Sequence, residues 1–132
     1  MRSLVLLVVG LVVGALLTLI GINALHRGTA WPNAVMAEMG QQMKAMDQNV
    51  KANHCAATDI SPRLQTLRLV ANDIEPAFAG EQDDPQFGRY AADLRAAADA
   101  ALVAPPASCD AAKAILSNLG KACDSCHRDF KN

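Results

Sequence analysis

The sequence has no large excess of charge of either sign. Its 12 lysines and arginines are balanced by 13 aspartates and glutamates, for a net charge of −1. Proteins that bind nucleic acid through bulk charge carry a strong positive field, so this balance argues against a nucleic-acid partner. The sequence also lacks paired catalytic carboxylates, a Ser/His/Asp set and a phosphate-binding glycine loop, so we do not expect an enzyme.

Aromatic residues are scarce, at 4 %, although 52 % of the 132 residues are hydrophobic. Alanine supplies much of the apolar content, which favours closely packed helices over strands. No strand pattern, repeat or low-complexity tract competes with that interpretation. The length provides for one domain of ordinary size rather than two.

Charge is absent from an apolar run near the N-terminus, Leu4 to Ile22. At about 1.5 Å per helical residue, the run matches the hydrocarbon core of a bilayer. A secretory signal normally has a shorter apolar region, so we predict a retained transmembrane anchor over residues 1–26. A cleaved signal is the alternative, with a late cleavage site at Gly28-Thr29-Ala30.

The charge beside this run predicts its orientation. Arg2 places the N-terminus in the cytoplasm, so residues 27–132 are exported. We therefore expect a single-pass protein of the bacterial inner membrane whose domain lies in the periplasm. If the signal is cleaved, the domain is soluble in the periplasm. Either way the domain lies in a compartment that permits disulfides.

Residues 27–132 divide into four segments at helix-start signals. In Ser-Pro and Asp-Pro pairs, the side-chain oxygen of the first residue accepts a hydrogen bond from a free backbone N–H of the first helical turn. The proline that follows has no N–H that would be left without a partner. The four starts are Trp31-Pro32, Ser61-Pro62, Asp84-Pro85 and Ser108.

Each segment carries one apolar stripe at helical spacing. Four striped helices with short links pack as an antiparallel up-down-up-down four-helix bundle, which is the all-α fold we predict. Pro76 should end the second helix early. The stripe of the first helix is Met36, Met39, Met43, Met46 and Val50, and that of the fourth is Ala112, Leu116, Leu119, Cys123, Cys126 and Phe130.

The fourth stripe ends in Cys123-Asp124-Ser125-Cys126-His127. Cys-x-x-Cys-His is the attachment signature of c-type haem, in which two thiols bond the haem and the adjacent histidine binds its iron. A thioredoxin-like dithiol would normally begin a helix in a strand-helix-strand fold. A zinc site would need further ligands, and His54, Cys55 and Cys109 form no second paired cluster.

The bundle, this motif near the C-terminus, and the following Phe130 and Lys131 resemble the class II cytochromes c, the cytochrome c′ family. The resemblance covers residues 31–132. It implies one covalent haem c held by Cys123 and Cys126, with His127 as the proximal iron ligand. The membrane segment departs from the usual soluble members.

The distal side of the iron separates two behaviours within the family. Up-down topology brings the start of the first helix beside the end of the fourth, and the family's pattern places Met36 at the distal position. A methionine there binds iron in the low-spin branch and suits electron transfer. The other interpretation is that the methionines simply fill the core. An arginine often seen nearby in the family is absent, and Trp31 and Pro32 occupy that region.

Two further cysteines lie where the ends of the first and fourth helices share the opposite pole. In an oxidising compartment Cys55 and Cys109 are therefore expected to form a disulfide, and two free core residues are the alternative.

The sequence thus predicts a membrane-tethered periplasmic cytochrome that transfers single electrons. Its expected partners are periplasmic or membrane-bound redox proteins and the machinery that attaches haem c. The family also forms dimers through its first two helices, so a homodimer is a further expectation. The alternatives are a five-coordinate protein that binds NO or CO, and a haem-free thiol or metal-binding assembly protein.

Overall fold

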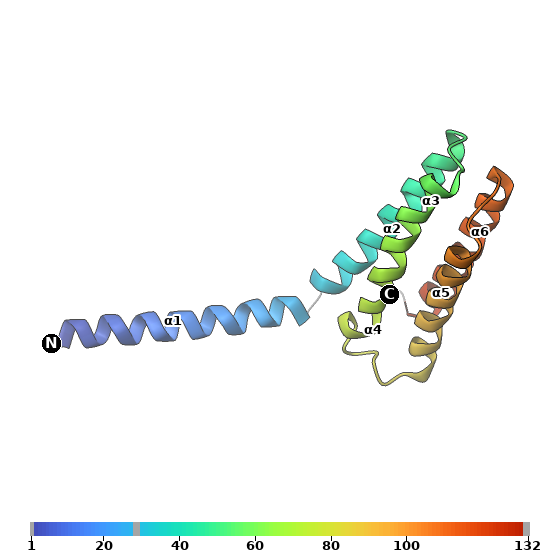
Figure 1. The fold of residues 1–132 in the computed structure, drawn as a ribbon. Helices are drawn as coiled ribbons and strands as arrows, with labels where there is room; N and C mark the ends of the chain where they lie inside the picture. The colour runs from blue at the N-terminus through green and yellow to red at the C-terminus, as the bar shows by residue number, and fades with distance from the viewer. Residues whose placement is uncertain (1, 28–29, 131–132) are drawn as a thin grey trace.

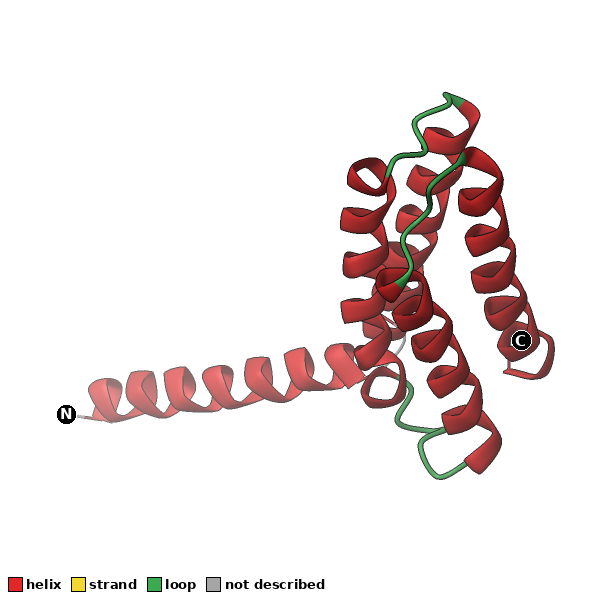
Figure 2. Cartoon of the chain, turned by 45° about the vertical axis from the view of Figure 1, so that its right-hand side comes forward, coloured by secondary structure: helices red, strands yellow, loops and turns green. Residues whose placement is uncertain are grey.

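The computed structural model describes residues 2–27 and 30–130, without the side chains of residues 4 and 25–27. These residues form helices and loops and no strand (Figure 1, Figure 2), which confirms the all-helical prediction. The elements are α1 (Arg2–Arg27), α2 (Ala30–Lys51), α3 (Ala57–Val70), the 3₁₀ turn η1 (Ala71–Asp73), α4 (Ile74–Ala77), α5 (Pro85–Val103) and α6 (Cys109–Phe130).

Helix α1 contains the apolar run and extends away from the other helices (Figure 1). Its stretch Val5–Ala24 has a mean hydropathy of 2.9, and none of that stretch is buried. By length and composition it can cross a membrane or act as a signal sequence. Gly28 and Thr29 of the proposed cleavage site lie outside the described residues.

Two predicted helix starts are confirmed by their caps. Asp84 accepts hydrogen bonds from the backbone N–H groups of Gln86 and Phe87, at 2.7 and 3.4 Å, and α5 begins at Pro85. The Ser108 hydroxyl accepts from the N–H of Ala111 at 3.1 Å, and α6 follows directly. Local side-chain chemistry was sufficient to locate both starts.

The predicted start at Ser61-Pro62 is wrong. Helix α3 begins at Ala57, so Pro62 lies inside it. The carboxylate of Asp59 accepts the Ala56 N–H at 3.1 Å and caps the earlier turn, and fully buried Ile60 anchors that turn in the core. These contacts outweigh the one helical hydrogen bond that Pro62 cannot donate.

The early end of the second predicted helix is confirmed. Helix α3 stops at Val70, and the chain tightens into η1 before the short α4, which contains Pro76. Pro76 cannot donate a helical hydrogen bond to the Asn72 carbonyl, and Asn72 lies in the 3₁₀ turn η1 rather than in an α-helix. The change of direction carries Phe78 towards the start of α5, where its ring lies 5.6 Å from that of Phe87.

The four long helices after α1 pack in pairs. Helix α2 lies against α3 and α6, and α5 lies against α3 and α6 (Figure 1). Aliphatic, methionine and alanine side chains fill the space between them, and α6 contributes the fewest buried residues of the four. The largest side chains without exposed surface are Phe87, Met46, Ile60, Leu64, Leu67 and Leu119.

The apolar stripe of α2 faces the core differently from the prediction. Gln42 is buried at 4 % exposure and donates to Glu38, whereas Met36 and Met43 remain half-buried. Met39 and Met46 are buried as expected. One side of α2, with Met39, Gln42 and Met46, is therefore buried, whereas Met36 and Met43 beside it remain partly exposed.

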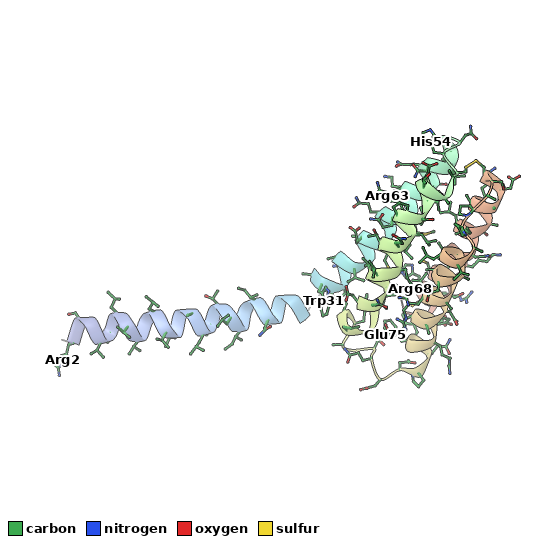
Figure 3. The ribbon with its side chains drawn as sticks, viewed as in Figure 1. Arg2, Trp31, His54, Arg63, Arg68 and Glu75 are labelled. Carbon is green, nitrogen blue, oxygen red and sulfur yellow. A yellow bond between two sulfur atoms is a disulfide. The ribbon has the colours of Figure 1, made fainter. Side chains whose placement is uncertain are left out.

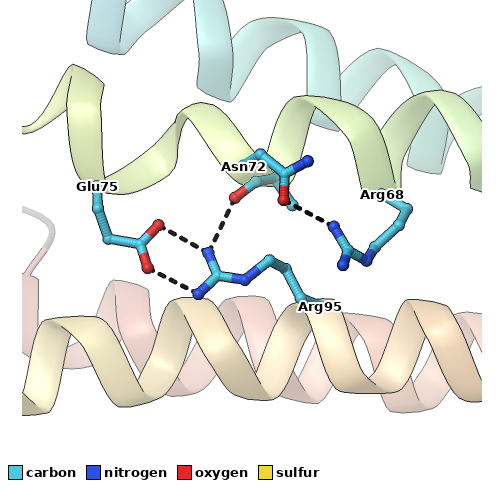
Figure 4. Close-up of polar contacts among 5 residues, drawn as sticks. Arg68, Asn72, Glu75 and Arg95 are labelled. Carbon is cyan, nitrogen blue, oxygen red and sulfur yellow. Dashed lines mark hydrogen bonds and ion pairs between the residues drawn. The ribbon is translucent and has the colours of Figure 1, made fainter.

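An ion pair joins α4 to α5 (Figure 4). Arg95 donates to both carboxylate oxygens of Glu75 at 2.7 Å and to the Ala71 carbonyl at 3.3 Å. Arg68 of α3 bonds Asp99 of α5 and Asn72. A bidentate arginine–carboxylate contact requires a specific geometry. Together with the bond to the Ala71 carbonyl, it therefore fixes the position of α5 relative to η1 and α4.

Candidate functional site: the hollows between α2 and α6

Two adjoining hollows lie between the first turns of α2 and the last turns of α6. The first, of about 270 Å³, extends between α2, α5 and α6. The second, of about 520 Å³, opens towards the loop after α4. Met36, Cys126 and His127 border both hollows, and Cys123 borders the first. The four residues predicted for the haem site thus all border the first hollow.

Helical spacing brings the α6 residues to this region. Cys123 and Cys126 lie one turn apart, and His127 follows on the neighbouring face. Leu119, one turn earlier, is fully buried and anchors the helix. The two cysteines are half-buried and His127 is exposed, so these side chains border the hollows without being sealed in the core.

The lining fits a haem group. Apolar side chains dominate, and Asp124 is the one carboxylate bordering the first hollow. Gly40 of α2 and Gly120 of α6 both border the first hollow. A Cβ added at either glycine would meet no atom within 4 Å. Thiols and an imidazole on one wall and a thioether on the other match the ligands of a c-type haem.

Burial raises the pKa of both site thiols above the ordinary value. Asp124 raises the pKa of Cys123 further, and Asp129 does the same for Cys126. Both thiols are therefore protonated at neutral pH when no group is bound to them. In the part of the chain that is described, no three His, Cys, Asp or Glu side chains gather as metal ligands.

Sequence reasoning missed an aromatic support on the α5 side. Phe130 packs edge-on against Phe87 at 5.2 Å and against Tyr90 at 6.2 Å. The Tyr90 hydroxyl donates to Asp129 at 2.5 Å. These contacts hold the last turn of α6, which carries His127, against α5. In the sequence, the spacing of three residues between Phe87 and Tyr90 indicates only that both rings lie on one side of α5. It does not identify their partners, Phe130 and Asp129, which lie on α6.

Cys55 and Cys109 lie at disulfide distance, at the other end of the helices. Their sulfurs are 1.95 Å apart and their Cα atoms 5.0 Å apart. Figure 3 shows this bond at the end that carries His54, away from Trp31. Asn53 adopts a left-handed conformation (φ 59°) and the His54 N–H donates to the Asn49 carbonyl at 2.8 Å, and these features end α2 just before Cys55.

Comparison of the chain with known protein families, with curated proteins and with solved structures found no match. The likeness to the cytochrome c′ family therefore depends on the residues themselves. One of these residues, Lys131, lies outside the described residues.

Proposed function

We propose that this protein is a membrane-tethered c-type cytochrome that transfers single electrons. One observation carries the proposal: Met36 of α2 borders the same two hollows as Cys126 and His127 of α6. The Cys-x-x-Cys-His motif and Met36 are at least 87 residues apart along the chain, yet all of these residues border the first hollow.

Cys123 and Cys126 would hold one haem c through two thioether bonds, and His127 would bind its iron. The group supplies a centre that gains and loses one electron. The chain contributes the apolar lining, which lowers the local dielectric, and the α5 contacts that support the last turn of α6. Exposure of His127 leaves an edge of the site near the surface, where a redox partner can approach.

Met36 is the preferred distal ligand among the methionines. Met39 and Met43 border only the first hollow, whereas Met36 borders both. Met36 is also half-buried, so it is not simply core filling in the way that fully covered Met46 is. Histidine and methionine together suit electron transfer, because neither oxidation state demands a large rearrangement.

We further infer that α2, α3 with α4, α5 and α6 form an antiparallel up-down-up-down bundle, with residues 27–132 as one domain. The neighbour relations of these helices support this arrangement. The Cys55–Cys109 pair also supports the arrangement, because it brings the end of α2 close to the start of α6, at the end of the bundle opposite the proposed haem site.

Helix α1 supports a location at the bacterial inner membrane, with the haem domain in the periplasm. An anchor confines the domain to a thin layer and raises its effective concentration near membrane-bound redox proteins. The expected partners are such proteins, and the machinery for haem attachment must act first. The anchor is compatible with a homodimer through the first two bundle helices if the N-termini of both protomers face the same membrane.

Visible spectra of the full chain, produced with a c-type maturation system, test the ligand assignment. The proposal predicts sharp low-spin bands in the reduced protein that CO leaves unchanged. Met36→Leu should convert the spectrum to a high-spin form that binds CO. Met46→Leu is the matched control, because Met46 lies on the same helix, fully buried and away from both hollows.

Each other spectrum supports a different function. A wild-type spectrum that shifts at once with CO would contradict methionine ligation and favour a five-coordinate protein that binds NO or CO. A chain without bound haem would contradict both and favour a thiol or metal-binding assembly protein.

A further inference from the structure

His127 lies in the last turn of α6, which ends at Phe130. The last backbone carbonyls of a helix have no partner within it, and terminal turns open more readily than the turns before them. A ligand that binds iron needs a fixed orientation, which contacts from the surrounding protein normally supply. Contacts from outside α6 must therefore hold this turn if His127 is to serve as the proximal ligand.

Tyr90 of α5 supplies a polar contact of this kind. Its hydroxyl donates to the Oδ2 atom of Asp129 at 2.5 Å, and its ring lies edge-on to Phe130, with centroids 6.2 Å apart. Asp129 and His127 belong to the same turn of α6. Tyr90 and His127 also both border the first hollow. One side chain thus joins the turn of His127 to α5.

Asp129 is an unfavourable residue for the place it occupies in α6. The C-terminal end of a helix carries a partial negative charge, so a carboxylate in the last turn is destabilising. Asp129 also contacts the adjacent Arg128, at 3.7 Å between Oδ1 and Nε, but the Arg128 side chain is 72 % exposed. An exposed ion pair of this kind contributes little to stability. The hydrogen bond from Tyr90 therefore gives Asp129 its connection to another helix.

We propose that Tyr90 is a positioning residue for His127: its hydroxyl, through Asp129, fixes the last turn of α6 so that the imidazole faces the proposed haem site. Apolar packing is non-directional, whereas a hydrogen bond restricts both distance and direction. The consequence at the iron rests on the proposed function. The fixing of the turn does not depend on bound haem.

Tyr90→Phe tests the hydroxyl alone, because the ring and its contact with Phe130 remain. The full chain is produced in a host without c-type maturation, and its amide hydrogen exchange is followed by NMR in detergent. We expect the amides of residues 126–130 to exchange about fivefold faster than in the wild type, which corresponds to the loss of one typical hydrogen bond. Ser108→Ala is the matched control, because it removes a hydrogen bond to Ala111 at the other end of α6 and should leave residues 126–130 unchanged. Circular dichroism establishes that each variant remains helical.

The haem-loaded chain provides a readout that a merely structural contact would not change. We expect Tyr90→Phe to raise the reduction potential, because a less firmly held His127 stabilises oxidised iron less well. This substitution changes no charge. In an Asp129→Ala background Tyr90→Phe should cause no further shift, since the hydroxyl acts through Asp129. Ser108→Ala should have the wild-type potential.

An unchanged or lower potential in Tyr90→Phe would overturn the proposal. An equal shift with and without Asp129 would also overturn it, because the hydroxyl would then act on the haem directly. If haem attaches with the predicted spectrum while exchange at residues 126–130 does not respond, the role of Tyr90 fails and the proposed function stands. If maturation yields no covalent haem while exchange responds as expected, the proposed function fails and the fixing of the turn stands.

Discussion

Removing the link between Cys55 and Cys109 should strongly destabilise the helical domain. The two cysteines are 54 residues apart in sequence, and the cross-link joins the end of α2 to the start of α6. In the chain-entropy treatment, closing a loop of that length in the unfolded state contributes about 4 kcal/mol to the free energy of unfolding. For a domain of about 100 residues this corresponds to a fall in Tm of about 15–30 °C.

Urea denaturation of the full, haem-free chain in detergent, followed by circular dichroism, measures the effect. The test variant is Cys55→Ala with Cys109→Ala. Its matched control is Cys123→Ala with Cys126→Ala, which removes two sulfurs without removing a cross-link. We expect a loss of about 4 kcal/mol in the test variant and less than about 1 kcal/mol in the control. Equal losses in the two variants would refute the reasoning, because covalent closure of the loop would then contribute nothing.

Two further changes probe the packing around the site. Arg95→Met should lower the free energy of unfolding by about 1 kcal/mol at neutral pH, because it removes the pair with Glu75. Arg95 lowers the pKa of Glu75, so the pair stabilises the fold fully above the ordinary value of 4.5; the difference between variant and wild type should shrink below 4.5 and vanish once the pH falls below the lowered pKa, and a constant difference across the titration would contradict this. Phe87→Ala should cost about 3–5 kcal/mol in urea denaturation, since Phe87 is 2 % exposed and supports Phe130, whereas Leu69→Ala, at 67 % exposure, should change stability by less than about 0.5 kcal/mol. A similar cost for both substitutions would be the contrary result.

Local signals predicted those helix ends that side-chain chemistry alone determines. Asp84 and Ser108 cap their helices through contacts within three residues, so sequence was sufficient to locate them. Ser61-Pro62 has the same local pattern, but Ile60 is fully buried and the carboxylate of Asp59 caps the earlier turn. The sequence could not show that tertiary packing would hold residues on both sides of Pro62 in one helix.

Much of the candidate site could also be predicted from sequence. The spacing of Cys123, Cys126 and His127 implies their common region, and the expected topology brings Met36 to them. The half-burial of Met43 could not be foreseen, because the 3.6-residue period permits either Gln42 or Met43 to face the core. Contacts between distant elements, such as that of Tyr90 with Asp129, depend on how the helices align after packing.

Intact mass spectrometry is the decisive test of whether Cys123 and Cys126 hold a haem covalently. The full chain, co-produced with a c-type maturation system, is extracted with acidified organic solvent before its mass is measured. The account predicts a mass increase of one haem that survives extraction and disappears when both Cys123 and Cys126 are changed to serine. An unmodified mass for the wild-type chain, under conditions in which a known c-type cytochrome is matured in the same host, would contradict it.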